Sequence, residues 1–187
     1  MPTDREHQIE AALRQAARGD SDAFADLVRE HQGMVFSIAW HFLQDRSVAE
    51  DVAQEVFLEL YRRLADIQSP AHLTFWLRRV ATHRSFDHGR RFKSRREQTL
   101  EGLPEPASEK AESDPLLHRQ LRQTLMSLPE KQRMVVLLRY QEGLGPAEIA
   151  EILEMPVNTV KSTLHRCLEE LRGKLTRRLG EVRYAFF

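Results

Sequence analysis

The chain has 187 residues with 28 basic and 28 acidic side chains, and its hydrophobic share of 41% and charged share of 30% are typical of small folded domains with charged surfaces. No stretch approaches the roughly 18 apolar residues of a membrane span, and the charged start MPTDREHQIE lacks the apolar core of a signal peptide. The single cysteine, Cys167, excludes an internal disulfide and a cysteine-rich metal site, so we expect a cytoplasmic protein with no membrane insertion.

The N-terminal part of the chain carries helical patterns and no strand signals. A helix is expected from about Ala23, with Asp20 or Ser21 as its N-cap. Apolar residues recur along it at steps of three and four as far as Phe42, which is the period of a helix with one buried face. Gly33 lies in the middle of this pattern, and we expect it to kink or break the helix.

A second helix is predicted to open at Ser47, because Ser47 and Glu50 form the S-x-x-E pattern of a capping box. Its apolar stripe is Val48, Val52, Val56, Leu60 and Leu64, with Ala49, Ala53, Phe57 and Tyr61 alongside. Ser69 and Pro70 supply a cap and a first-turn proline for a third helix over about residues 73–91.

Residues 97–115 differ in composition from everything around them. They contain three prolines and one basic residue against six acidic ones, with few apolar side chains. Such a segment buries little surface, so little offsets the entropy lost on ordering it. We interpret it as an acidic flexible linker between two domains, residues 1–96 and residues 116–187.

The C-terminal part returns to helical patterns. One helix is expected from Pro115 to Leu128, and a second follows from about Glu130 until Gly143 stops it. Two more are expected over residues 146–153 and 157–179, separated by a short break. The sequence therefore predicts an all-α protein with two small helical domains.

The last two of these helices have the layout of a helix-turn-helix. Ile149, Ala150 and Leu153 are predicted to face inward on the first helix, and Val157, Val160 and Leu164 on the second. The residues left on the outer face are of the types that contact phosphates and base edges in a major groove. These candidate DNA-binding residues are Asn158, Thr159, Lys161, Ser162, Thr163, His165 and Arg166. The alternative is an amphipathic hairpin with a solvated polar face.

The segments SLPEKQRMVVLLRYQEGLGPAEIAEIL and MPVNTVKSTLHRCLEELRGKL resemble the fourth conserved region of sigma factors, the promoter-specificity subunits of bacterial RNA polymerase. The resemblance implies that this domain sits on the β flap of the polymerase and reads the upstream, minus-thirty-five promoter element. A similar segment occurs at the DNA-binding end of some response regulators. Many relatives have an arginine at the position of Thr163.

The segment AEDVAQEVFLELYRR resembles the second conserved region of sigma factors. The resemblance implies that this helix docks on the coiled-coil clamp helices of the polymerase β′ subunit. The candidate polymerase-binding residues lie off the buried stripe and are Asp51, Gln54, Glu55 and Leu58. Without the resemblance, the same residues would be interpreted as a solvated acidic face on a core helix.

Residues 73–96 interleave aromatic side chains with basic ones, as a site for single-stranded nucleic acid requires. Resemblance to the same family implies minus-ten recognition and melting here, with the preceding loop, residues 67–72, forming part of a pocket for a flipped-out base. The candidate residues are Trp76, Arg78, Arg79, His83, Arg84, Asp87, Arg90 and Arg91. Trp76 also fits a core position, and many relatives have an asparagine in place of His83.

Other functions find less support in the sequence. His83, Asp87 and His88 have the spacing of a shared metal site, but no metalloprotease, phosphate-loop or nucleophile–base pattern accompanies them. We therefore expect no catalytic site, metal or other cofactor. A dimeric repressor remains an alternative, although the N-terminal patterns have no purpose in one. The prediction is a sigma factor of the extracytoplasmic-function group that binds bacterial core RNA polymerase, promoter DNA and an anti-sigma factor.

Overall fold

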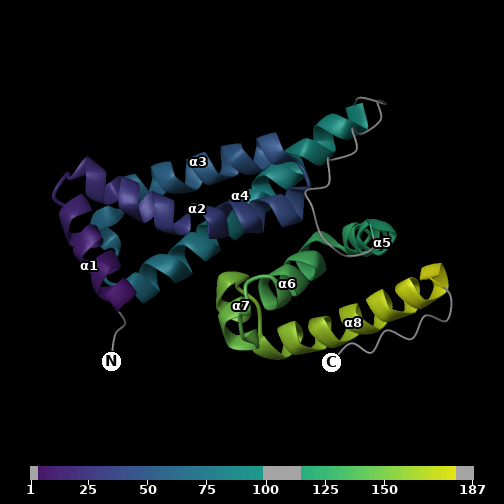
Figure 1. Ribbon diagram of the computed structural model, residues 1–187. Coiled ribbons are helices and arrows are strands. Elements are labelled where there is room, and N and C mark those ends of the chain that lie inside the picture. The colour runs from purple at the N-terminus through teal and green to yellow at the C-terminus, as the bar shows by residue number, and fades with distance from the viewer. Residues whose placement is uncertain (1–3, 99–114, 180–187) are drawn as a thin grey trace. The chain divides into compact units, whose positions relative to one another are not determined.

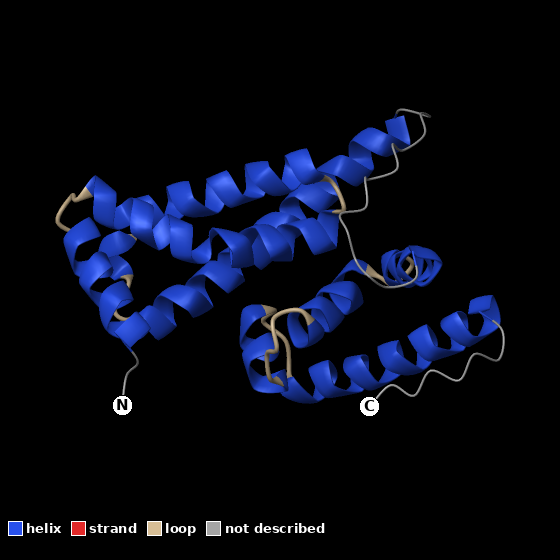
Figure 2. Cartoon of the chain, in the orientation of Figure 1, coloured by secondary structure: helices blue, strands red, loops and turns tan. Residues whose placement is uncertain are grey.

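The computed structural model describes residues 4–98 and 115–179. Throughout these ranges the secondary structure is helical, with no strand, as Figure 2 shows. The all-α prediction is confirmed. The chain divides into two compact units, residues 1–102 and residues 103–187. Most of the predicted linker, residues 99–114, and the tail after Leu179 lie outside the described residues.

Within its described residues the N-terminal unit contains four α-helices, which are labelled in Figure 1, and one turn of 3-10 helix. In chain order they are α1 (Asp4–Ala16), α2 (Ser21–Leu43), α3 (Arg46–Arg62), η1 (Leu64–Asp66) and α4 (Pro70–Gln98). The helices α2, α3 and α4 pack against one another, and α1 covers α2 and part of α4.

Helix α2 begins as predicted but does not break. The Asp20 carboxylate caps it by accepting from the N–H groups of Asp22 and Ala23, at 2.9 and 3.1 Å. The helix then runs unbroken through Gly33 to Leu43, so the predicted break is wrong. An exposed glycine costs a helix only about 1 kcal/mol relative to alanine, and burial of apolar residues on the following turns offsets that cost.

Helix α3 starts earlier than the capping-box pattern predicted. Its N-cap is Asp45, whose carboxylate accepts from the Val48 N–H at 3.0 Å. Ser47 lies inside the helix, and the Glu50 carboxylate pairs with the Arg46 guanidinium at 3.0 Å. The predicted cap was wrong because Asp45 stands at the right distance before Val48 and offers a charged acceptor to the helix N-terminus.

The core of this unit lies between α2, α3 and α4. Each helix contributes side chains that are almost wholly removed from solvent. They are Leu27, Val35, Ile38, Ala39, Phe42, Val52, Val56, Leu60, Leu73, Leu77 and Ala81. The predicted stripe of α3 is therefore largely correct, although Tyr61, placed beside it, is 59% exposed.

Over residues 115–179 the C-terminal unit has four helices, whose bounds lie close to the predicted ones. They are α5 (Pro115–Met126), α6 (Glu130–Tyr140), α7 (Pro146–Ile152) and α8 (Val157–Leu179). The helices α5, α6 and α7 each pack against α8, which thereby forms the spine of the unit. The buried apolar residues include Leu128, Met134, Val136, Leu138, Ile149, Ile152, Val160, Cys167 and Leu171.

A tight turn joins α7 to α8 and produces the predicted helix-turn-helix. Before α7, the Glu148 carboxylate accepts from the Gly145 N–H at 2.8 Å. After α7, Glu154 adopts a left-handed conformation with φ of 52°, and the Met155 N–H donates to the Ala150 carbonyl at 3.0 Å. This six-residue closure satisfies a carbonyl at the helix end and redirects the chain into α8.

Candidate polymerase and nucleic-acid interfaces

One face of α3 presents polar and apolar side chains to solvent. Asp51, Gln54 and Leu58 are all exposed and follow one another at steps of three and four residues. Leu58 is 57% exposed, although the stripe on the opposite side of the helix is buried. Tyr61 continues the row three residues later, and its ring contacts that of Phe24 edge-on, with centroids 5.2 Å apart.

Tyr61 is a candidate interface residue that the sequence interpretation missed. It was assigned to the edge of the buried stripe because it follows Phe57 by four residues. The spacing of Asp51, Gln54, Leu58 and Tyr61 is itself a helical face, and this signal could have identified it. We refer to these four residues as the α3 outer face.

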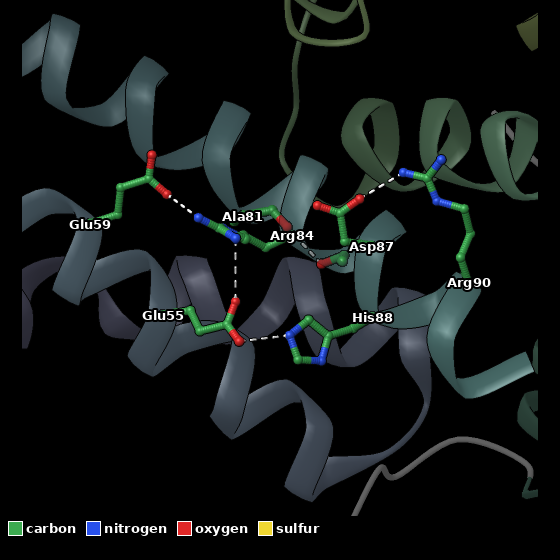
Figure 3. Close-up of polar contacts among 8 residues, drawn as sticks. Glu55, Glu59, Ala81, Arg84, Asp87, His88 and Arg90 are labelled. Atoms are coloured by element: carbon green, nitrogen blue, oxygen red, sulfur yellow. Dashed lines mark hydrogen bonds and ion pairs between the residues drawn. The ribbon is translucent and has the colours of Figure 1, made fainter. Parts of the chain in front are cut away.

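Glu55 does not belong to that face, although it was predicted to be exposed together with Asp51. Its carboxylate turns toward α4, where Oε1 lies 3.0 Å from His88 Nε2 and Oε2 lies 3.7 Å from Arg84 Nη1 (Figure 3). The prediction of a freely exposed Glu55 is corrected by this arrangement. Four residues along a helix rotate a side chain by about 40°, which is enough to carry Glu55 to the adjoining helix.

Arg84 also lies between the two helices. Its Nη2 donates to Glu59 Oε2 at 2.7 Å, in addition to its contact with Glu55 (Figure 3). The hydrogen bond that Arg84 donates to Glu59, together with the charges of nearby carboxylates, raises the pKa of the Arg84 guanidinium. Arg84 was predicted as a DNA-binding residue, but in this structure its guanidinium is engaged by α3.

The solvent side of α4 carries the other predicted DNA-binding residues. Arg79, His83, Arg90 and Arg91 are exposed, and the first three share a face because they are four and seven residues apart. Asp87 is half-buried and accepts from Arg90 Nη2 at 2.7 Å. The remaining two predicted residues, Trp76 and Arg78, are half-buried.

The segment before α4 is held by hydrogen bonds to the first turn of that helix. Ser69 Oγ accepts from the His72 N–H at 3.1 Å, which confirms Ser69 as the cap of α4. His72 Nδ1 in turn accepts from the Gln68 N–H at 3.2 Å. The predicted pocket loop, residues 67–72, is therefore only partly a loop, because its last three residues form the first turn of α4.

On α8, most of the predicted recognition residues face solvent. The exposed ones are Asn158, Thr159, Lys161, Ser162, His165 and Arg166. Their described contacts are local to the helix: Ser162 Oγ donates to the Thr159 carbonyl at 3.1 Å, and Arg166 Nε donates to the Ser162 carbonyl at 3.3 Å. His165 Nε2 lies 3.5 Å from Glu169 Oε1.

Thr163 is the exception, because it is buried at 6% exposure and does not reach the outer face. Val157, predicted to face inward, is 39% exposed. The buried row of α8 is Val160, Thr163, Cys167 and Leu171, at spacings of three, four and four. The prediction that Thr163 faces outward was therefore wrong. Leu164 was predicted to be the buried residue because it is apolar, but it is Thr163 that is buried in the structure.

Within residues 4–98 and 115–179, no cluster of three or more His, Cys, Asp or Glu side chains could hold a metal ion. His88 and Asp87 belong to the possible metal site considered from the sequence. In the structure His88 contacts Glu55, and Asp87 contacts Arg90. None of the described helices is both long and apolar enough to span a membrane.

Comparison with known families and proteins agrees with this organisation. The family described as sigma-70 region 2 matches residues 27–96, and sigma-70 region 4 matches residues 118–171. Among solved structures, CnrH in complex with the cytosolic domain of CnrY has a TM-score of 0.65 at 23% identity, over 94% of this chain and 99% of that one. The sigma factor RpoE of Bartonella quintana, solved with the anti-sigma factor NepR, has a TM-score of 0.67 at 18% identity, over 86% and 98%. These two similarities show the fold.

Characterised relatives are similar over nearly their whole length. The ECF RNA polymerase sigma factor SigW of Bacillus subtilis is 33% identical, over 91% of this chain and 98% of the relative. The ECF RNA polymerase sigma-E factor of Escherichia coli is 32% identical, over 87% and 92%. The chain therefore belongs to the extracytoplasmic-function group of RNA polymerase sigma factors, which direct promoter-specific transcription initiation.

Proposed function

We propose that the N-terminal unit binds the β′ clamp helices of core RNA polymerase through the α3 outer face. The observation that carries this proposal is the exposure of Leu58 and Tyr61 beside Asp51 on a helix whose opposite side is buried. Burying one leucine side chain contributes about 1.5 to 3 kcal/mol. The neighbouring carboxylate and amide suit a partner with a basic rim, which fixes the register of docking.

The second part of the proposal concerns the downstream promoter element. The face of α4 with Arg79, His83 and Arg90 would follow the phosphates of the minus-ten element, while the loop of residues 67–72 helps to hold an extruded base. Extruding a base costs a few kcal/mol, so strand capture must be supported by the contacts with polymerase. Trp76 is half-buried, and we assign it to support of this face.

The C-terminal unit would sit on the β flap and place the start of α8 in the major groove of the minus-thirty-five element. Lys161 and Arg166 offer charges to phosphates or guanine, and Asn158 offers an amide suited to adenine. The separation of the two DNA elements would then be set by the polymerase. The chain contributes no catalytic group in this proposal, and RNA synthesis belongs to the polymerase.

An anti-sigma factor is the proposed regulatory partner. The similar sigma factor RpoE was solved bound to the anti-sigma factor NepR. The exposed α3 outer face of this chain offers such a partner a surface on which it would compete with polymerase. The expected competitor covers Leu58 and Tyr61.

Reconstitution with bacterial core polymerase tests the polymerase interface. The double variant Asp51→Arg, Leu58→Asp should raise the Kd for core enzyme at least tenfold, a loss of about 1.4 kcal/mol or more. The matched control is Glu10→Arg, which reverses an exposed charge on α1, away from the α3 outer face. Unchanged binding by the double variant would contradict the interface assignment.

The upstream element is tested by transcription with the reconstituted enzyme. Start sites mapped on genomic DNA should share two spaced upstream motifs. Lys161→Ala and Arg166→Ala should each lower transcription that depends on the upstream motif while leaving the Kd for core enzyme unchanged. Arg172→Ala, an exposed arginine further along α8, is the control. An equal fall in core binding would show that α8 has another role.

A further inference from the structure

Two rows of polar side chains face each other across the contact between α3 and α4. Glu55 and Glu59 are one turn apart on α3, and Arg84 and His88 are one turn apart on α4. Arg84 contacts both glutamates, at 3.7 and 2.7 Å, and His88 contacts Glu55 at 3.0 Å (Figure 3). The later residue on α4, His88, pairs with the earlier residue on α3, Glu55, so the two rows run antiparallel to each other.

The two polar rows lie beside the apolar side chains through which α3 and α4 pack against each other. Val56 and Leu60 on α3, and Leu77 and Ala81 on α4, are fully buried. Apolar burial is non-directional, so it holds the two helices together without dictating one rotation of α4. The hydrogen bond between Arg84 and Glu59 has a preferred geometry, and it therefore selects one rotation.

Each row belongs to a helix with a proposed interface of its own. The glutamates share α3 with the α3 outer face, and Arg84 and His88 share α4 with Arg79, His83 and Arg90. Arg84 lies five residues after Arg79, which places it about 140° around the helix. It is therefore directed toward α3, away from the proposed DNA face.

We propose that Arg84 is a positioning residue for promoter opening and not a ligand of the promoter. By binding Glu59 and Glu55 it sets the rotation of α4 relative to α3, so that the DNA face of α4 is correctly oriented when α3 is docked on polymerase. This inference rests on the proposed function of the two helices and replaces the prediction that Arg84 contacts DNA.

The test uses the full-length chain in holoenzyme with the variants Arg84→Gln, Glu59→Gln and their double. The readouts are the Kd for core enzyme, the rate of promoter opening followed by permanganate reactivity of unpaired thymines, and the salt dependence of promoter binding. Each single variant should slow opening about three- to tenfold with core binding within about twofold of wild type. The double variant should be no slower than either single variant, since all three lose the same contact.

Two further variants separate positioning from a general loss of stability. Arg84→Lys keeps a charge within reach of Glu59 and should restore most of the opening rate. Arg29→Gln removes an exposed arginine that pairs with Asp26 on α2, and it should leave opening unchanged. Thermal unfolding measured for every variant shows whether slower opening merely follows a lower stability, a result that would overturn the inference.

A DNA-binding role for Arg84 gives a different pattern. Arg84→Gln would then reduce the salt slope of promoter binding by about one, whereas Glu59→Gln would release the arginine and leave opening unimpaired or faster. Either that pattern or unchanged opening by both single variants would overturn the inference while leaving the proposed function in place. Failure of the wild-type chain to bind core enzyme would instead overturn the proposed function, and the inference with it.

Discussion

The helix pair α3–α4 and the helix pair α7–α8 use flanking polar residues in opposite ways. At α3–α4, charged side chains beside the buried stripe meet one another, as Glu55 and Glu59 do with Arg84. At α7–α8, the polar residues of the second helix face solvent and bond within their own helix, as Ser162 and Arg166 do. A polar residue beside a buried stripe is thus available to a partner only when the adjoining helix leaves it unoccupied.

The lengths of the helices explain much of this difference. Helix α3 has 17 residues and α4 has 29. The polar residues beside the buried stripe of α3 can therefore contact α4 over several turns. Helix α7 has seven residues and can contact only about two turns of α8. Within those turns α7 packs against the buried side of α8, so the exposed face from Asn158 to Arg166 has no neighbour from α7 to pair with.

The largest expected effect comes from placing a charge at the buried position of the recognition helix. Thr163→Asp should lower the stability of the C-terminal unit by about 3 kcal/mol or more, because a carboxylate would be buried without a partner. The control Ser162→Asp adds the same charge one residue earlier, at an exposed position, and should cost under about 1 kcal/mol. Urea unfolding followed by far-UV circular dichroism measures both. Equal losses would show that Thr163 is not a core residue.

The same experiment can assign the loss to one unit. Both tryptophans of the chain, Trp40 and Trp76, lie in the N-terminal unit. Their fluorescence should therefore report an unchanged transition in Thr163→Asp while the helical signal of the C-terminal unit is lost early. A shift of the tryptophan transition would contradict independent unfolding of the units.

The next effect is a pH dependence confined to the N-terminal unit. His31 is buried on α2, and burial lowers its pKa below the ordinary value of 6.5, opposed by Glu30 and assisted by Arg5 and Arg78. As the pH falls below 6.5, the unfolded chain takes up the proton before the folded chain does, so stability falls with falling pH. Replacing His31 with Gln should remove the contribution of His31 to the change in the free energy of unfolding between about pH 7.5 and 5.5. Tryptophan-monitored urea unfolding at the two pH values checks it, and an unaltered slope would exclude His31 as its source.

A smaller effect on stability should distinguish an ion pair at the α3–α4 contact from an ion pair on the surface. Glu59→Ala should destabilise the N-terminal unit by about 1 kcal/mol, since it removes the acceptor for a half-buried arginine. Asp26→Ala breaks an exposed pair with Arg29 within one helix and should change stability by about 0.3 kcal/mol or less. Thermal unfolding at low and high salt compares them. Equal and salt-insensitive changes would mean that the α3–α4 row contributes no stability.

The smallest effect concerns two glycines on long helices. Gly33→Ala should stabilise the N-terminal unit by about 0.5 to 1 kcal/mol, because α2 is helical there and a Cβ would meet no atom within 4 Å. At Gly89 the added Cβ would lie 3.2 Å from the buried Phe42 ring, so Gly89→Ala should give no gain. Differential scanning calorimetry measures both transitions. A destabilised Gly33→Ala would show that α2 is irregular at that position.

Local patterns were sufficient for most of the helices and for the exposure of many of the candidate interface residues. The cap at Ser69 was predicted, and Asp20 was one of two candidates for the cap of α2, because capping depends on residues within one turn. The helices of the C-terminal unit were predicted to within a few residues, and the exposed row from Asn158 to Arg166 was predicted apart from Thr163. Family membership followed from the same local segments, AEDVAQEVFLELYRR and the helix-turn-helix.

What the sequence by itself determined was therefore the helices other than α1 and η1, their division into two parts and the residue types on each face. The tertiary structure decided the rotation of each helix and what its flanking residues meet. One residue along a helix turns a side chain by about 100°, so a shift of one position buried Thr163 and exposed Val157. The pairing of Glu55 and Glu59 with Arg84 joins residues 25 or more positions apart, and no local period contains that information.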